Sequence, residues 1–494
     1  MNLASLFARS AERYADKTAV FWGEAEHSYQ ELLCLSLAVA SRLRNGHSVR
    51  AGDFVGLLLK NRPEFIPALF GSLETGAVVV PINHFLKPDE ISHITVDAAL
   101  KVLITEMAFA EFLPRLSEMH PGLEFLLIDE VTADEGQNWE PLPDSEARGE
   151  SDLALLIYTS GTTGRPKGAM LSHGNLLHNV ESCRQVLAAV DFDRFVLLLP
   201  MFHSFMLCVC IVLPLYVGGS IVLIKSLHPL KNVIQEIVLR QATILPAIPQ
   251  FFRALADSPP AVELPLRLCV SGAAPLPGQV LKDFMARFSI PLLEGYGLSE
   301  ASPVVAINPV KGPWKAGSIG VPIPDVRVSV QDEAGHLLAP GQIGEICVQG
   351  GNVMMGYWNQ PEATTQALRG GWLLTGDVGY QDADGYCFIT DRKKDMLLVN
   401  GINVYPREIE EVIYQYPGIR EVAVIGQPDP RRGEQPVAFV ATATGTGLDE
   451  KALVRFMRAK LADYKVPRRV VILPSLPRNG TGKILKTVLR QCLD

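Results

Sequence analysis

The chain has 494 residues, too many for one small hydrophobic core, and this length favours about two to four domains. With 48% hydrophobic and 20% charged residues it has the composition of a globular enzyme, which excludes a disordered chain. The formal net charge of −8 provides no general attraction to nucleic acid or to an anionic membrane.

The first twenty residues, MNLASLFARSAERYADKTAV, are predicted to form the first packed helix. Leu3, Leu6 and Phe7 share one helical face, whereas Glu12 and Asp16 are mixed with the arginines. A signal peptide would have an uninterrupted apolar core, and a transit peptide would be poor in acids. The eight cysteines are spread over the chain without a CxxC pair, which is typical of reduced thiols and predicts a cytoplasmic protein.

Between about residues 50 and 350, short apolar runs alternate with segments long enough for helices. The runs are FVGLLL, GAVVVP, VLITE, EFLLID, GGSIVLI and RLCVSG. Strands that are apolar throughout are typical of parallel sheets covered by helices on both faces. The sequence therefore predicts an α/β fold of layered parallel sheets.

One stretch, Phe205 to Ile224, carries no charge and is long enough to cross a bilayer. Pro214, Gly218 and Gly219 interrupt it near the middle. We therefore predict a buried helix of about three turns, a glycine turn and a buried strand. Membrane contact, if the substrate requires it, is expected to be peripheral, at the inner membrane face.

After about residue 320 the strands are punctuated by glycines, which predicts antiparallel hairpins. Within this region acids alternate before a glycine at Asp382 to Gly385, as they do in calcium loops. An EF-hand would require an acid in place of Tyr380 and a glutamate in place of Asp391. We interpret the segment as a hairpin turn.

Beyond the charged segment Asp391 to Asp395, the sequence predicts a compact α+β unit of about a hundred residues. Its expected elements are a strand, the helix PREIEEVIYQYP, the strands EVAVIGQPD and QPVAFVAT, a helix over 449–462 and a basic closing segment. We therefore divide the chain into a large N-terminal domain, residues 1–392, which includes an antiparallel β subdomain, and a small C-terminal domain, residues 393–494.

The strongest local motif is YTSGTTGRPKG, Tyr158 to Gly168, which follows the apolar run LALLI. Glycines let backbone N–H groups approach an anion, hydroxyls donate hydrogen bonds and Lys167 adds a positive charge, so the motif indicates phosphate binding. A nucleotide loop of the GxxxxGK[ST] kind is excluded, because the chain contains neither Gly-Lys-Ser nor Gly-Lys-Thr. A polar surface loop would explain the residue types but not their density.

With this motif the chain resembles the adenylate-forming family of acyl-CoA synthetases, nonribosomal adenylation domains and luciferases, and within it looks like the bacterial medium- and long-chain fatty acid:CoA ligases. The resemblance covers nearly the whole chain, and six motifs in register exclude coincidence. The further motifs are LPMFHSF around His203, SGAAPL from Ser271, EGYGLSE from Glu294, TGD from Thr375, DRKKDMLLVNGINVYPREIEEV and PRNGTGKILK. The resemblance implies an enzyme that joins a carboxylic acid to AMP and then passes the acyl group to a thiol, that of coenzyme A.

The resemblance also implies catalytic residues. The first half-reaction brings a carboxylate onto the α-phosphate of ATP, and because both are anions, cations must gather there. Lys483 would supply the decisive positive charge, and Glu300 would bind Mg²⁺ with help from Thr159. His203 would border the acyl pocket in a gating or positioning role.

Nucleotide recognition is implied for a larger set of residues. Tyr296 would lie on the adenine ring, the backbone of Gly272 to Ala274 would cover the other face, and Asp377 with Arg392 would hold the ribose hydroxyls. Ser299 stands where many relatives have threonine and keeps the hydroxyl. The residues expected at ATP or AMP are Thr159, Ser160, Gly161, Thr162, Thr163, Gly164, Lys167, Gly272, Ala273, Ala274, Glu294, Gly295, Tyr296, Gly297, Ser299, Asp377, Arg392 and Lys394.

The resemblance also implies a mobile C-terminal domain that rotates between the half-reactions on a hinge, which here would be Lys394. Rotation would remove Lys483 from the site and bring in the loop around Gly401, which would leave room for the pantetheine of CoA. His173 and His178 are five residues apart, off the spacing of two metal ligands on one helical face, and we assign them no site.

The segment after His203 lacks the Asp that amino-acid adenylation domains use to pair with the substrate ammonium, which disfavours an amino acid. We expect the acyl pocket to be lined by HSFMLCVCIVLPL, by AIPQFF at Ala247 to Phe252 and by ASPVVA at Ala301 to Ala306. These apolar segments suit an alkyl chain. We therefore predict a fatty acid:CoA ligase that uses ATP, Mg²⁺ and coenzyme A.

Three alternatives stay open: an aryl acid:CoA ligase, a fatty acyl-AMP ligase that loads a carrier protein, and a non-catalytic nucleotide-binding relative. The last is disfavoured because Lys483, Glu300 and Lys167 are all present, and the second because no extra insertion is evident. The expected partners are the small carboxylic acid, ATP and CoA, without nucleic acid. The sequence does not decide the acyl chain length, or between a monomer and a homodimer.

Overall fold

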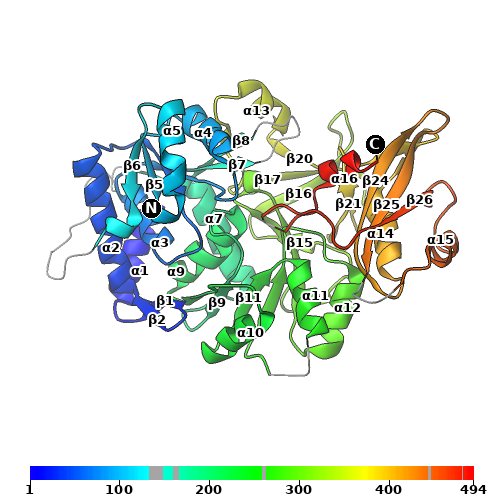
Figure 1. Cartoon of the computed structure of the whole chain (residues 1–494), viewed down its shortest axis with the longest axis horizontal. Coiled ribbons are helices and arrows are strands. Elements are labelled where there is room, and N and C mark those ends of the chain that lie inside the picture. Colours follow the sequence, from blue (N-terminus) through cyan, green and yellow to red (C-terminus); the bar gives the residue numbers. More distant parts are fainter. Residues whose placement is uncertain (133–147, 160–165, 259–262, 443–446, 481, 494) are drawn as a thin grey trace.

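The computed structural model describes the chain except for residues 133–147, 160–165, 259–262, 443–446, 481 and 494. Within the described residues the strands form four sheets with helices packed around them, and the C-terminal residues, orange and red, lie at one end of the molecule (Figure 1). The predicted α/β class, with a large N-terminal part and a smaller C-terminal part, is confirmed. No helix in the described ranges combines the length and apolar character needed to cross a bilayer.

The first sheet carries two of the family-like motifs at its strand ends. Its strands are β1 (Thr18–Trp22), β2 (Ala25–Ser28), β9 (Arg194–Leu197), β10 (Ser220–Leu223), β11 (Ile244–Ala247), β12 (Leu268–Ser271), β13 (Leu292–Gly297), β14 (Val304–Ile307) and β15 (Val321–Pro322). They lie in the order β15–β14–β13–β12–β11–β9–β10–β1–β2. The run from β13 to β1 is parallel as predicted, whereas the pairs at the two edges are antiparallel.

The second sheet contains the strand that leads into the phosphate motif. Its strands are β3 (Phe54–Leu58), β4 (Val78–Pro81), β5 (Val102–Thr105), β6 (Glu124–Leu127), β7 (Leu153–Thr159), β8 (Lys167–Ser172) and β18 (Gly356–Tyr357), in the order β18–β8–β7–β4–β3–β5–β6. Strands β8 and β18 depart from the parallel prediction by pairing antiparallel. The reason is length, because the connection 160–166 between β7 and β8 is too short for the crossover that parallel strands require.

Helix α7 (His173–Leu187) lies between these two sheets and contacts β7 and β8 of one and β14 of the other. It begins at a capping box, in which the Ser172 side chain accepts a hydrogen bond from the backbone N–H of Asn175. The uncharged stretch beginning at Phe205 is helical through α8 (Ser204–Met206), η4 (Leu207–Val212) and α9 (Leu213–Val217), turns at Gly218 in the left-handed conformation and continues as β10. The prediction of a buried helix, glycine turn and buried strand is confirmed.

The remaining helices of the N-terminal part cover the sheets. The predicted first helix is confirmed, with Leu3, Leu6 and Phe7 buried. These helices are α1 (Leu3–Arg13), α2 (Tyr29–Ser41), η1 (Arg42–Gly46), α3 (Phe65–Glu74), α4 (Pro88–Asp97), η2 (Met107–Phe112), α5 (Leu113–Met119), η3 (Ile128–Glu130), α10 (Leu230–Leu239), α11 (Pro249–Asp257), α12 (Gly278–Arg287), η5 (Ser299–Ala301) and α13 (Pro361–Ala367).

The third sheet is antiparallel, as the glycine pattern predicts. It consists of β16 (Val326–Gln331), β17 (Gly344–Gly350), β19 (Leu368–Arg369), β20 (Trp372–Gln381) and β21 (Cys387–Arg392). The segment Asp382 to Gly385 is the turn between β20 and β21, which confirms the hairpin interpretation. The ammonium of Lys315 donates to the carboxylates of Asp382 and Asp384 at 2.5 and 2.6 Å, so a lysine occupies the place where a calcium loop would bind its ion.

The C-terminal residues form the fourth sheet and its helices. The elements are β22 (Leu397–Val399), β23 (Ile402–Val404), α14 (Pro406–Tyr414), β24 (Ile419–Asp429), β25 (Gly433–Thr442), α15 (Glu450–Arg458), β26 (Arg469–Ile472) and α16 (Lys486–Gln491). The predicted order is confirmed, although α15 ends before residue 462. Leu397, Val424, Val440 and Leu453 belong to an apolar cluster made of residues from this part of the chain.

Candidate active site

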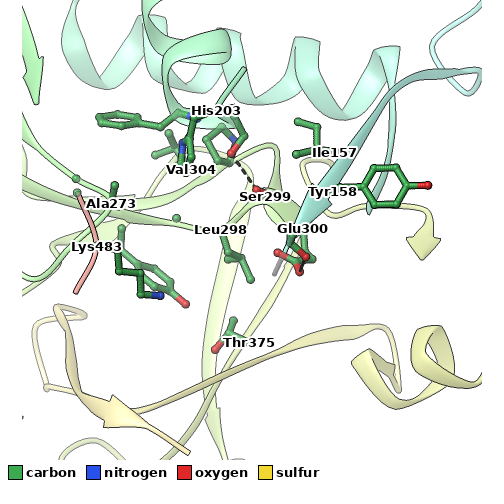
Figure 2. Close-up of a pocket in the computed structure, with 18 of the residues that line it drawn as sticks. Ile157, Tyr158, His203, Ala273, Leu298, Ser299, Glu300, Val304, Thr375 and Lys483 are labelled. Atoms are coloured by element: carbon green, nitrogen blue, oxygen red, sulfur yellow. Dashed lines mark hydrogen bonds between the residues drawn. The ribbon is translucent and has the colours of Figure 1, made fainter. Parts of the chain in front are cut away.

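A cavity of about 930 Å³ lies where the ends of β7, β13 and β21 and the middle of β20 meet the C-terminal segment. Residues far apart in the sequence converge on it: Figure 2 shows Lys483 on one side of Leu298 and Glu300 on the other. The predicted site residues that line it are Thr159, Lys167, His203, Gly272, Ala273, Gly295, Tyr296, Gly297, Ser299, Glu300, Asp377, Arg392, Lys394 and Lys483.

The phosphate motif approaches the cavity from the second sheet. Thr159 is the last residue of β7 and Lys167 the first of β8, and the two residues pair across the antiparallel strands. This pairing fixes a hydroxyl and an ammonium at the cavity wall. The motif residues between them, Ser160, Gly161, Thr162, Thr163 and Gly164, lie outside the described residues.

Glu300 stands at the centre of a small polar cluster. Its Oε1 accepts hydrogen bonds from the hydroxyl of Tyr357 at 2.9 Å and from Thr159 Oγ1 at 3.4 Å. In the described part of the chain no group donates to Oε2. A carboxylate oxygen beside a threonine hydroxyl is a donor set of the kind that Mg²⁺ prefers, so these residues fit the ion that the family resemblance implies.

Tyr357 is a member of this cluster that the sequence analysis missed. The ammonium of Lys167 lies 5.2 Å from the centre of its ring, so Tyr357 touches both the cation and the carboxylate of the site. Burial first, and then the charge of Glu300, raise the pKa of its phenol, which keeps the hydroxyl protonated as a donor. The string MMGYWNQPEAT contains Tyr357, but only the pairing of β18 with β8 reveals its position.

A second cluster joins β13, β20 and β21. The hydroxyl of Tyr296 donates to Asp377 Oδ2 at 2.5 Å, and Arg392 Nε lies 3.2 Å from Asp377 Oδ1. Asp377 and Arg392 face each other in the antiparallel register of β20 and β21, so the sheet itself positions the pair. Asp377 is 5% exposed, and it therefore offers a fixed acceptor to a hydroxyl ligand.

Lys483 reaches the cavity on a tight turn near the C-terminus. Its backbone N–H donates to the Asn479 side chain at 2.9 Å, and its carbonyl accepts from Asn479 N at the same distance. The ammonium is accessible from the open cavity, but protein surrounds it on its other sides. This desolvation, with the nearby charges of Arg392 and Lys394, lowers the pKa of Lys483 to about 8.

His203 caps the short helix α8, and its ring nitrogen Nδ1 accepts a hydrogen bond from the Phe205 N–H at 3.3 Å. Burial and then the charge of Lys483 lower the pKa of His203 to about 4, so the imidazole is neutral at physiological pH. The next residue, Ser204, shares a hydrogen bond of 3.1 Å with Ser299 (Figure 2). This bond connects the segment after β9 with the segment after β13.

One side of the cavity is apolar. In Figure 2, His203 and Val304 lie at the top of the view and Thr375 at the bottom, with Ser299 and Leu298 between them. The apolar lining on this side comes from α7, α8, η4, β12 and β14. These elements contribute Cys183, Val186, Leu187, Phe205, Val209, Val270, Val304 and Ile307, and other segments add Leu86, Ile94, Ile157, Phe202, Leu298 and Leu485 to the cavity.

The three segments expected at the acyl pocket differ in whether they line this cavity. The segments after His203 and Ala301 contribute as predicted, but none of Ala247 to Phe252 lines the cavity. Phe252 instead packs on Phe284 of α12, because α11 faces that helix. The three residues of α7 were missed, since nothing in its sequence shows that the helix lies between the two sheets.

Three predicted residues lie away from this cavity. Glu294 and Ala274 line an adjoining cavity of about 220 Å³ behind Tyr296. The Glu294 carboxylate accepts from the Leu276 N–H at 3.0 Å, and burial raises its pKa to about 7 against the opposing charge of Arg407. Gly401 lies in the turn between β22 and β23, with φ of +78°, and lines neither cavity.

Comparisons with known proteins place the chain in a family. The model of the AMP-binding enzyme family matches residues 7–358, and that of the AMP-binding enzyme C-terminal domain matches residues 408–483. The chain is similar to feruloyl-CoA synthase from Amycolatopsis sp, with 37% identity over 497 residues and 99% of each chain covered. It is also similar to long-chain-fatty-acid–CoA ligase from Salmonella typhimurium, with 35% identity over 530 residues that cover 99% of this chain and 94% of the relative.

A solved structure of a relative has the same fold as this chain. ATP-bound MatB from Rhodopseudomonas palustris superposes with a TM-score of 0.91 at 32% sequence identity, over 100% of this chain and 99% of that chain. The cavity and its clusters therefore lie in a fold that binds ATP in that relative.

Proposed function

Because this chain belongs to the AMP-binding enzyme family and is an ATP-dependent acid:CoA ligase, we propose that the acid it activates is a medium- or long-chain fatty acid. The observation that carries the proposal is the apolar lining from α7, η4, β12 and β14. Burying a methylene group against such a lining contributes about 0.8 kcal/mol, whereas a buried charge without a partner is costly. An alkyl chain is the substrate that fits these side chains best.

The polar clusters support a division of labour in the adenylation step. Lys483 and Lys167 would neutralise the negative charge that builds up when the carboxylate approaches the α-phosphate. Glu300 and Thr159 would hold Mg²⁺, which supplies further charge neutralisation at the phosphates when bound. Tyr357 would keep the Glu300 carboxylate in place, and the neutral imidazole of His203 would border the carboxylate of the acid.

The nucleotide would lie across the ends of β12 and β13. Tyr296 would contact the adenine ring, with Gly272, Ala273 and Ala274 opposite, and Asp377 with Arg392 would hold the ribose hydroxyls. The remaining residues that we propose at ATP or AMP are Thr159, Ser160, Gly161, Thr162, Thr163, Gly164, Lys167, Glu294, Gly295, Gly297, Ser299 and Lys394.

The transfer step would use a second orientation of the C-terminal domain. We place the domain boundary between residues 392 and 393, which is supported by the separate apolar cluster around Val424 and Val440. Rotation on Lys394 would withdraw Lys483 and bring the turn at Gly401 to the cavity as part of the CoA site. The exposed position of Gly401 in the present orientation is consistent with this sequence of steps.

An aryl acid is the second candidate, and the 37% identity to feruloyl-CoA synthase favours it. The apolar lining would also accept an aromatic ring. A carrier protein in place of CoA is the third candidate. A fatty acid and an aryl acid would differ in how activity depends on chain length. An alkyl chain gains binding free energy with each added methylene, whereas an aromatic ring fills a fixed volume.

The test is a panel of acids from hexanoate to oleate, with ferulate, cinnamate and benzoate, incubated with ATP, Mg²⁺ and either CoA or a carrier protein. We expect AMP release and thioester formation with CoA to increase with alkyl chain length through the medium and long range. A preference for ferulate or benzoate over every alkyl acid would overturn the fatty-acid proposal. Thioester formed only on the carrier protein would overturn the choice of CoA.

A further inference from the structure

Helix α14 of the C-terminal part is attached to the N-terminal part by Arg407, for which no step of the proposed reaction has a role. The Arg407 backbone N–H donates to Asp391 Oδ2 at 2.9 Å, and its Nη1 donates to the Ile389 carbonyl at 3.0 Å. Its Nη2 lies 3.6 Å from Glu294 Oε1. All three partners precede residue 393, so Arg407 attaches α14 to β21 and β13 at the same time.

Glu411 adds a contact one helical turn further along α14. Its Oε2 accepts a hydrogen bond from the backbone N–H of Gly278, the first residue of α12, at 3.3 Å. Residues four apart lie on the same face of a helix. One face of α14 therefore carries a cation and an anion, both partly shielded from solvent, that reach into the N-terminal part.

The burial of these groups makes the attachment specific to one orientation. The side chains of Arg407 and Glu294 are 11% and 6% exposed. A buried guanidinium requires its acceptors, and a rotation of α14 away from β13 would remove the Glu294 carboxylate and the Ile389 carbonyl together. The orientation that makes these contacts is the one in which Lys483 lines the cavity.

The charges near Arg407 also favour the orientation in which α14 contacts the N-terminal part. Burial raises the pKa values of Glu294, Glu411 and Asp391, and the charge of Arg407 opposes the shift at the two glutamates. Further cations line the adjoining cavity, namely Lys486, 3.0 Å from Glu410, with Arg392, Arg478 and Lys483, but the positive charge that acts on Glu294 and Glu411 is that of Arg407. Without Arg407, the orientation in which Lys483 lines the cavity would bring the carboxylates of Glu294 and Glu411 together with no arginine to offset their repulsion.

We propose that Arg407 and Glu411 form a docking clamp that holds the C-terminal part in the orientation that delivers Lys483, and that they are therefore positioning residues for adenylation but not for thioester transfer. The inference rests on the proposed two-orientation function. The clamp differs from the contacts of the loop that carries Lys483. There, Gly480 and Gly482 approach the apolar side chains of Phe85 and Ile248.

The first experiment measures the two half-reactions separately in Arg407→Met. Adenylation is followed as acid-dependent ATP–pyrophosphate exchange, and transfer as CoA ester formation from synthetic acyl-AMP. We expect adenylation to fall by about tenfold or more, as for loss of one partner in a buried charged contact, and transfer to stay within about twofold. The matched control is Arg455→Met, which removes an exposed arginine from α15 and should change neither half-reaction.

A second variant keeps the test decisive if Arg407→Met fails to fold. Glu411→Ala removes the acceptor of the Gly278 N–H and leaves Arg407 with its contacts to Ile389, Asp391 and Glu294. Its control is Glu450→Ala on α15. We expect the same split between adenylation and transfer, with a smaller loss. Equal loss of both half-reactions, or full adenylation activity, would overturn the clamp.

A third measurement needs no activity. Hydrogen exchange of a peptide spanning residues 275–282 reports on the Gly278 amide, which we expect to exchange faster in Arg407→Met than in the wild type and in Arg455→Met. Unchanged exchange would contradict the clamp. A wild-type protein inactive with every acid would instead refute the proposed function, and the exchange result would still stand.

Discussion

The cavity joins two regions that are built in different ways. In the polar region, side chains bond directly to one another: Tyr296 to Asp377, and Tyr357 to Glu300. In the apolar region, Val304 and Cys183 line the cavity beside other apolar side chains, and hydrogen bonds join both to Asn179 instead of to other side chains of the lining. Hydrogen bonds specify residue type and orientation, whereas packing specifies volume. Changes in the polar region should therefore alter the rate with every acid, and changes in the apolar region should alter which acid is used.

The largest expected effect is at Lys483, because in the proposed adenylation step the C-terminal part would deliver its ammonium to the reacting phosphate. Lys483→Ala is expected to lower adenylation by about 10³-fold, as for loss of a preorganised charge. Transfer from supplied acyl-AMP to CoA should be largely intact, since the proposed rotation would withdraw Lys483 in that step. The measurement is pyrophosphate exchange beside single-turnover thioester formation.

The control for this prediction is Lys460→Ala, which removes a lysine on the surface of the C-terminal part. It should leave both half-reactions unchanged. If Lys483→Ala reduced both steps equally, the polar region would serve both reactions in one orientation, and the hinge at Lys394 would lose its support.

The next effect in size belongs to the apolar region. Val304→Phe places a larger side chain on β14 at the cavity wall, and we expect kcat/KM for long acids to fall by about 100-fold relative to short acids, because an overfilled wall excludes methylenes each worth about 0.8 kcal/mol. The control is Val190→Phe, a valine that is 37% exposed. A uniform loss over all chain lengths would show that β14 affects catalysis rather than selectivity.

The contrast between the regions also explains how much the sequence could reveal. Lys167, Glu300, Asp377 and Lys483 lie in short motifs, because each polar residue needs particular neighbours, and their convergence on one cavity follows the prediction from family resemblance. Tyr357 was not predicted as a site residue because its partners come from β8 and η5. A pairing between strands almost two hundred residues apart leaves no local pattern in the sequence.

The apolar region was harder to predict for a physical reason. Cys183 on α7 and Phe252 on α11 both belong to apolar helix faces, and apolar periodicity shows that a face is buried but not against which neighbour. The cavity lies beside α7, and α12 lies beside α11.

A smaller effect tests whether the hydroxyl of Tyr357 positions Glu300. Tyr357→Phe keeps the ring beneath Lys167 and removes the bond of 2.9 Å to Glu300 Oε1. We expect the Mg²⁺ concentration required for half-maximal ATP binding to rise by about tenfold, as for a hydrogen bond to a charged group worth about 1.5 kcal/mol. Calorimetric ATP titrations at several Mg²⁺ concentrations measure this without turnover.

Tyr216→Phe is the matched control, because it removes a tyrosine hydroxyl that also bonds to a glutamate, Glu181, away from both cavities. It should leave the Mg²⁺ dependence unchanged. An unchanged Mg²⁺ requirement in Tyr357→Phe would mean that Thr159 alone suffices to position Glu300.

The smallest expected effect is a pH dependence of adenylation, which should arise in the polar region of the cavity and not in the apolar region. The pKa of Lys483 is lowered to about 8 by desolvation and by Arg392 and Lys394, so the ammonium is charged below pH 8 and loses its proton as the pH rises through that value. We expect kcat/KM for ATP in adenylation to fall by about fourfold between pH 7 and pH 8.5, whereas an ordinary lysine would stay charged. Lys483→Arg should remove this pH dependence, because a guanidinium remains charged throughout the range. Chain-length preference, which depends on the apolar region, should be the same at both pH values; if it shifted with the pH of the assay, the two regions would be coupled and the division between them would fail.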